Sequence, residues 1–122
     1  MANFFLIWAA IFGFLSVALG AFGAHSLKAV LDDYGRQIWE KAVLYQMFHT
    51  AALMATGILQ NLFKDINFNI SGYAFITGII LFSGSLYILA LSNIKLLGAV
   101  TPFGGIAFMI GWGFLAYRLL KL

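Results

Sequence analysis

Four long apolar stretches, separated by short polar segments, account for most of the chain. They cover residues 3–24, 42–62, 71–91 and 101–119, and the first of them carries no charged side chain. Because a helix rises about 1.5 Å per residue, each stretch is about as long as the hydrocarbon core of a bilayer is thick, which is about 30 Å. The pattern therefore predicts four helices that span a membrane.

The segments between these stretches are too short to hold further domains. Lys64 and Asp65 indicate a solvent-exposed turn after the second stretch, and Asn93 and Lys95 indicate another after the third. Short turns make neighbouring helices antiparallel, and a helix satisfies its own backbone hydrogen bonds in lipid. We therefore expect an all-α, up-down, transmembrane four-helix bundle that forms one domain over residues 1–122. Basic residues are divided almost evenly between its two ends, which leaves the membrane orientation open.

The connection between the first two stretches is the charge-dense part of the chain. Apolar residues recur there at the helical spacing i, i+3, i+4 and i+7, in Leu27, Val30, Leu31 and Tyr34. This spacing predicts a short amphipathic helix over residues 26–34, lying at the level of the lipid headgroups. Ser26 is expected to cap its start and Gly35 to end it.

Hydroxyl side chains mark the expected starts of the last two helices. Ser71 precedes the third apolar run, and Thr101 precedes Pro102 at the start of the fourth. A hydroxyl side chain accepts a hydrogen bond from a free backbone N–H of the first turn, and proline suits the first helical position. We therefore expect Ser71 and Thr101 to act as N-caps.

The composition indicates that lipid surrounds the folded chain. Of 122 residues, 63% are hydrophobic and 9% are charged, which leaves too few charged side chains to cover a water-soluble domain of this size. Disordered chains, disulfide scaffolds and nucleic-acid readers are excluded, since each needs polar, cysteine-rich or strongly basic sequence. A cleaved signal peptide at residues 3–24 is disfavoured, because no basic region precedes this stretch and it exceeds the usual apolar run of about 7–15 residues.

Small residues recur at spacings of four along the apolar stretches. Helices in lipid associate through close packing, and small residues at this spacing let two backbones approach each other. With 13 Gly and 13 Phe in the chain, we also expect aromatic rings to fill the notches that glycines leave. These rows of small residues face either a neighbouring helix or a second copy of the chain in a homo-oligomer. The residues predicted to pack in this way are Gly13, Ser16, Gly20, Ala24, Ala107 and Gly111.

The second apolar stretch carries the most polar side chains. Tyr45, Gln46, His49 and Thr50 project from one side of a helix, and polar groups in hydrocarbon are costly unless they are paired. This side is therefore expected to face the inside of the bundle. The expected partners are His25, Ser83, Ser85, Tyr87 and Thr101.

Two functions remain open for this cluster. It is either a hydrogen-bonded network that fixes the register of the helices, or a proton, ion or solute site of a small transporter with His49 as its titrating group. The first reading describes a non-enzymatic membrane protein that acts through lipid or protein partners. The spans hold no cysteine or carboxylate that could complete the ligand shell of a metal ion or haem. A hydrolase would need a hydrogen bond between His49 and Ser83 or Ser85, and the sequence around these serines does not require one. We expect no cofactor, no metal, no nucleic-acid partner and no catalytic residue.

Five motifs together resemble one known family. They are GAFGAH at 20–25, YQMFHT at 45–50, LFSGSLY at 81–87, TPFGG at 101–105 and GW at 111–112. In this order they are similar to the small membrane proteins known as domain of unknown function 423, which include bacterial inner-membrane proteins and a short eukaryotic transmembrane relative. The resemblance covers nearly the whole chain and implies a four-span membrane protein, without an activity or catalytic residues. It also implies that the family keeps His25, His49, Ser83, Ser85, Tyr87 and Thr101.

Overall fold

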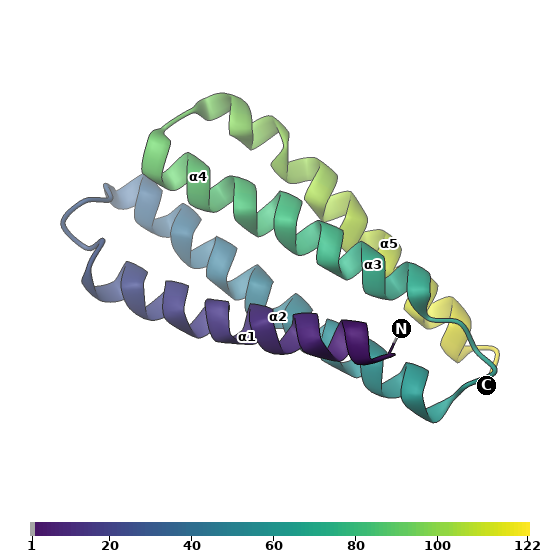
Figure 1. Ribbon diagram of the computed structural model, residues 1–122. Helices are drawn as coiled ribbons and strands as arrows, with labels where there is room; N and C mark the ends of the chain where they lie inside the picture. Colours follow the sequence, from purple (N-terminus) through teal and green to yellow (C-terminus); the bar gives the residue numbers. More distant parts are fainter. Residues whose placement is uncertain (1) are drawn as a thin grey trace.

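The computed structural model describes residues 2–122 and is helical along most of its length (Figure 1). In chain order the elements are α1 (Ala2–His25), α2 (Asp33–Leu62), α3 (Asn69–Gly78), the π-helix η1 (Ile79–Gly84), α4 (Ser85–Ser92), the 3-10 helix η2 (Lys95–Ala99) and α5 (Thr101–Leu119). α3, η1 and α4 follow one another without a break, so they form one rod from Asn69 to Ser92. With α1, α2 and α5 this rod makes four helices long and apolar enough to cross a membrane.

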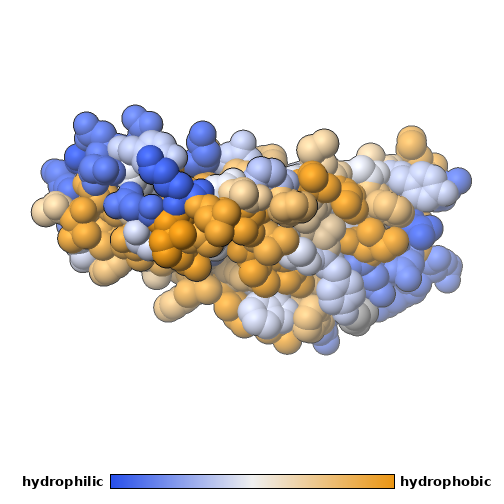
Figure 2. Space-filling model, turned by 90° about the horizontal axis from the view of Figure 1, so that it is seen from above, coloured by the Kyte–Doolittle hydropathy of each residue, from blue (hydrophilic) through white to orange (hydrophobic). Residues whose placement is uncertain are grey.

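Neighbouring helices run antiparallel, as the short connections predicted. The connection after α1 and the 3-10 helix η2 lie at one end of the molecule, and the connection after α2 and the C-terminus lie at the other (Figure 1). α1 packs mainly on α2, and α5 packs mainly on α3 and η1, so α2 and the third rod form the centre. Hydrophilic residues gather at the two ends while hydrophobic residues cover the middle (Figure 2). The predicted all-α fold with four spanning helices is confirmed.

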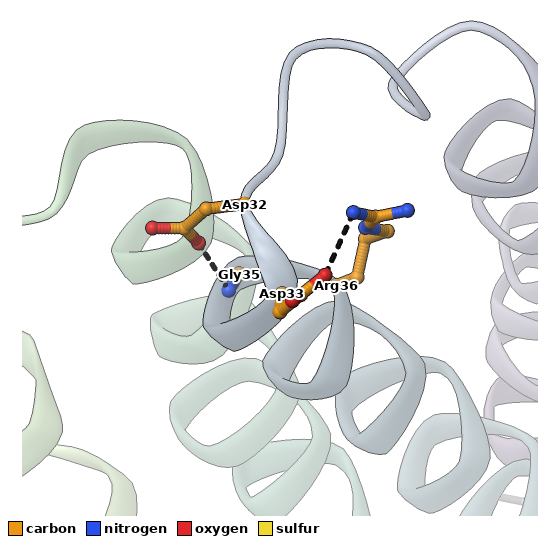
Figure 3. Close-up of polar contacts among 4 residues, drawn as sticks. All are labelled: Asp32, Asp33, Gly35 and Arg36. Atoms are coloured by element: carbon orange, nitrogen blue, oxygen red, sulfur yellow. Dashed lines mark hydrogen bonds and ion pairs between the residues drawn. The ribbon is translucent and has the colours of Figure 1, made fainter.

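The short amphipathic helix predicted over residues 26–34 is wrong. Residues 26–30 form turns, and α2 begins at Asp33 instead of near residue 42. The reason is the N-cap of α2: Oδ1 of Asp32 accepts a hydrogen bond from the backbone N–H of Gly35 at 2.7 Å (Figure 3). This cap fixes Gly35 in the first turn of α2, where the prediction had placed the end of a helix.

The apolar residues of this connection do not share one face. Leu27 and Leu31 are buried in a cluster with Trp39 and Ala90, whereas Val30 is 69% exposed. Both leucines point into the end of the bundle, against Trp39 of α2 and Ala90 of α4, instead of into the headgroup layer. The leucines thus close this end of the bundle over α2 and α4.

The predicted caps at Ser71 and Thr101 are also wrong. α3 begins at Asn69, whose backbone N–H donates to Oδ1 of Asn67 at 2.8 Å, and the Ser71 side chain is buried inside the helix. α5 begins at Thr101, with Pro102 in its first turn, but the Thr101 hydroxyl pairs with Ser85 at 2.7 Å. Both hydroxyls face the interior, because this end of each helix already lies against another span.

Aromatic rings fill the notches left by glycines, as the sequence predicted. A Cβ atom added at any of four glycines would overlap the ring of a residue on another helix. The pairs are Gly23 with Trp39, Gly72 with Phe5, Gly78 with Phe108, and Gly111 with Phe75. The helices therefore interlock through large rings against bare backbone, the close packing that holds helices together in lipid.

The small residues predicted for packing differ in their surroundings. Beyond Gly111, a Cβ atom at Gly13 or Gly20 would make only ordinary contacts, 3.7 Å from Thr50 and 3.4 Å from Val43. Ser16 is buried and donates to the carbonyl oxygen of Phe12 at 2.7 Å. Ala107 is partly buried on α5, and Ala24 is exposed near the end of α1. A glycine outside the predicted set, Gly104, lies against backbone: an added Cβ there would overlap the backbone nitrogen of Phe82.

Gly104→Ala tests this close approach of α5 to the π-helix. The added methyl group meets the backbone of Phe82, which cannot rotate away, so we expect the free energy of unfolding to fall by about 1–3 kcal/mol. The matched control is Gly105→Ala, where nothing lies within 4 Å of the added atom. Thermal unfolding in detergent should separate the two variants, and equal melting temperatures would contradict the packing described.

Candidate functional site

The polar residues of α2 lie mostly on its buried side. Gln46, His49 and Thr50 are 3%, 4% and 8% exposed, while Tyr45 is 38% exposed and stacks on Phe82 of the π-helix with ring centroids 4.5 Å apart. Gln46 reaches α4 and His49 reaches α5, whereas Thr50 lies toward α1, with its methyl group 3.7 Å from the position of a Cβ atom at Gly13. The centre of the bundle is therefore polar on the α2 side.

Both ring nitrogens of His49 have hydrogen-bond partners. Nδ1 lies 2.8 Å from the carbonyl oxygen of Tyr45, and Nε2 lies 3.0 Å from Nε1 of Trp112 on α5. A carbonyl oxygen only accepts and an indole N–H only donates, so the proton must sit on Nδ1 and the lone pair on Nε2. The two partners thus fix one neutral tautomer of His49 and tie α2 to α5.

Aromatic rings enclose the imidazole. Phe108 stacks on it with ring centroids 3.5 Å apart and an interplanar angle of 8°, and Phe75 and Trp112 lie around it with centroids 6.0 Å away. Phe75 and Phe108 are themselves held in the notches at Gly111 and Gly78. The ring-against-glycine packing therefore builds the pocket that His49 fills.

Gln46 links three helices through its amide. Its Nε2 donates to the carbonyl oxygen of Phe12 on α1 at 3.0 Å, and its Oε1 accepts from the hydroxyl of Tyr87 on α4 at 2.6 Å. The Tyr87 ring also packs on Trp39 with centroids 4.7 Å apart. A single buried side chain thus joins the outer helix α1 to the two central helices.

The serines of the third rod pair with groups other than His49. Ser83, in the π-helix η1, donates to the carbonyl oxygen of Ala42 on α2 at 2.7 Å. Ser85 shares a hydrogen bond of 2.7 Å with Thr101, and Thr101 also donates to the carbonyl oxygen of Leu97 at 3.4 Å. Since both nitrogens of His49 are taken as well, the arrangement of these residues lacks the Ser–His contact that nucleophilic catalysis requires.

The residues predicted to form one cluster thus lie in separate groups. Tyr87 meets Gln46, Ser85 meets Thr101, and Ser83 meets the backbone of α2, while His25 is exposed at the end of α1, away from His49. The Thr50 hydroxyl is buried without a hydrogen-bond partner in the described part of the chain. Between residues 2 and 122, no group of three or more histidine or acidic side chains is placed to hold a metal ion.

Sequence reasoning missed Trp112 as the partner of His49. The signal that could have found it is chemical, because an indole N–H inside a membrane needs an acceptor. Trp112 lies one helical turn after Phe108, so both residues face α2 from the same side of α5. The unprotonated nitrogen of a buried histidine is a strong acceptor within reach of that side.

The comparisons with known proteins agree with this architecture. Residues 19–105 match the family described as protein of unknown function (DUF423). The chain belongs to this family. It is 47% identical over 108 residues to a UPF0382 membrane protein of Staphylococcus aureus, covering 88% of each chain, and 44% identical over 109 residues to one of Bacillus subtilis, covering 88% of this chain and 89% of the relative. No solved structure matches the chain significantly.

The family match covers only part of the candidate site. Gln46, His49, Ser83 and Tyr87 fall within the residues that match the family, whereas Trp112 lies beyond them. A UPF0382 membrane protein of Staphylococcus epidermidis aligns more fully, with 45% identity over 117 residues that cover 96% of this chain and 95% of the relative. The relatives are membrane proteins by name, which agrees with the four spanning helices.

A double-mutant cycle on Gln46 and Tyr87 tests the link between α2 and α4. Gln46→Leu and Tyr87→Phe should each lower the free energy of unfolding, and the double variant should lose less than the sum, by about 0.6 kcal/mol for the shared hydrogen bond. Unfolding in detergent gives the four stabilities. Gln46→Leu combined with Tyr34→Phe, an exposed tyrosine, serves as control and should be additive. Additivity in both cycles would show that the Gln46–Tyr87 bond adds nothing to stability.

Proposed function

We propose that this chain is a multi-pass protein of the bacterial cell membrane without enzymatic activity, which acts through lipid or protein partners. In this proposal the polar residues of α2 are structural: they hold the helices in register so that the outer faces keep a fixed shape. The membrane names of the relatives and the four spanning helices support the membrane part of the proposal.

The pairing of His49 carries the structural part. A proton relay needs a nitrogen that can release and take up protons from a pathway, but Nδ1 is engaged by the Tyr45 carbonyl and Nε2 by Trp112. The ring is 4% exposed and covered by Phe108 on one face. A group enclosed in this way stabilises helix contacts more readily than it exchanges protons.

A small transporter that uses His49 and its polar neighbours is the alternative function. The observation in its favour is that the buried hydroxyls of Thr50 and Ser71 have no hydrogen-bond partner among the described residues. Unpaired polar groups inside a membrane protein are candidates for contact with a passing ion or solute. Proton transfer through His49 would still require its two hydrogen bonds to open.

His49→Ala separates the two functions. If His49 is structural, losing its two hydrogen bonds should lower the free energy of unfolding by about 1 kcal/mol, with a further loss from the space left beside Phe108. Thermal unfolding in detergent and proton flux in dye-loaded liposomes are measured together. The matched control is His25→Ala, which removes an exposed imidazole and should change neither quantity. Unchanged melting together with altered proton flux would favour the transporter.

A further inference from the structure

A groove runs along the outer contact between α1 and α2. It holds a cavity of about 490 Å³ that starts at the charged end of the two helices, near Lys28 and Arg36, and extends past Val43 to Met47. A second cavity of about 430 Å³ also contains Met47 and continues along the same two helices to Gly13. The two cavities therefore follow one another along the face where α1 and α2 meet, and Met47 lines both.

Small residues of α1 leave this groove open. A Cβ atom at Gly20 would reach only ordinary contact with Val43 at 3.4 Å, and Gly23 receives the ring of Trp39. The indole N–H of Trp39 donates to the carbonyl oxygen of Leu19 at 2.9 Å, which fixes the ring between the helices. Trp39 thus makes a rigid floor, and beyond Glu40 the α2 side of the groove is apolar, with Val43, Leu44 and Met47.

The length of the groove suits an acyl chain. Met47 lies about 16 Å along α2 from Arg36, at about 1.5 Å per residue. Because α1 and α2 both span the membrane, the groove begins at the level of the headgroups and runs into the hydrocarbon layer. An extended fatty-acyl chain has the cross-section and polarity that such a groove between small residues accommodates.

The mouth of the groove carries two cationic side chains. Lys28 forms no ion pair in the part of the chain described, and Arg36 pairs with Asp33 through one terminal nitrogen at 2.8 Å. Asp33 is 93% exposed, so this pair is well solvated and weak. The Nε–H of Arg36 has no hydrogen-bond partner within residues 2–122, and Arg36 and Asp32 project to opposite sides of the first turn of α2 (Figure 3).

Arginine and lysine together are well suited to bind a phosphate. Guanidinium and ammonium groups both donate charge-assisted hydrogen bonds to phosphate oxygens, and these bonds are stronger than those between neutral groups. Glu40 lies in the same groove one turn after Arg36, on the hydrocarbon side of the cations. The charges therefore change from basic at the mouth to acidic one turn further in, which favours a headgroup whose phosphate stays at the mouth.

We infer that the α1–α2 groove binds one glycerophospholipid, with its phosphate between Lys28 and Arg36 and one acyl chain lying along the groove to Met47. The inference rests on the proposed function only in its claim that the chain acts through a lipid. It does not depend on the role of His49, because His49 lies on the buried side of α2.

Native mass spectrometry of the full chain tests the site. The protein is purified in detergent, mixed with phosphatidylglycerol or with diacylglycerol of the same acyl chains, and released from the micelle in the gas phase. We expect one phosphatidylglycerol per chain to be retained and diacylglycerol to be retained at least fivefold less. Excess glycerol 3-phosphate should leave the bound lipid in place, because the acyl chain contributes to binding.

Charge variants test the phosphate site. Lys28→Gln with Arg36→Gln should lower phosphatidylglycerol retention at least fivefold, while Lys64→Gln with Lys121→Gln, at the other end of the bundle, should not change it. Asp33→Asn is a second control, since it breaks the ion pair of Arg36 but keeps both cations. If Asp33→Asn lowers retention as much as the double variant, the ion pair and not the phosphate explains the effect, and the inference is overturned.

A steric variant keeps the test independent of the charges. Met47→Trp fills the point that the two cavities share and should lower retention at least fivefold, while Met109→Trp, an exposed residue on α5 outside the groove, should not. Equal retention by the two tryptophan variants, equal binding of phosphatidylglycerol and diacylglycerol, or a chain dimer that forms in place of lipid binding would each overturn the inference. Proton flux through His49 would contradict the proposed function alone, so the two failures can be told apart.

Discussion

The need to pair the amide of Gln46 and the imidazole of His49 inside the hydrocarbon layer governs the interior of this protein. Gln46 meets that need by donating to α1 and accepting from α4, and His49 meets it by bridging the backbone of α2 and Trp112 of α5. Because lipid offers no replacement partner, the bonds of Gln46 to α1 and α4 and of His49 to α5 fix the register of the helices that they join. The arrangement of all four spans follows from these few contacts and from the packing that brings them within reach.

Glycine notches make those contacts possible. Phe75 and Phe108 lie against bare backbone at Gly111 and Gly78, which brings α5 and α3 together and places both rings around His49 of α2. The π-helix η1 contributes from the other side, since it contains Ser83, whose hydroxyl reaches the backbone of α2. Short π-helical segments often mark functional or constrained positions in a helix, and here the segment lies where three helices meet.

The sequence predicted the features that depend on composition and local spacing. Four apolar stretches of sufficient length, the antiparallel order and the contacts between rings and glycines can be inferred without knowing which helix faces which. Contacts between distant residues could not be inferred in the same way. The Asp32 cap competes with the amphipathic pattern of the preceding turn, Thr101 turns to Ser85 because α4 lies beside it, and Trp112 meets His49 only after α5 has packed. Each of these depends on an arrangement in space that one segment alone does not specify.

The protonation of His49 tests the central claim most directly. In protein reconstituted into bilayers with ¹⁵N-labelled histidine, solid-state NMR distinguishes the two ring nitrogens, and His25→Ala leaves His49 as the only histidine. At neutral pH we expect a neutral imidazole with the proton on Nδ1 and an unprotonated Nε2, whose signal shifts when Trp112 is replaced by Phe. A proton on Nε2, or a charged imidazolium, would contradict a bundle held together by this pairing.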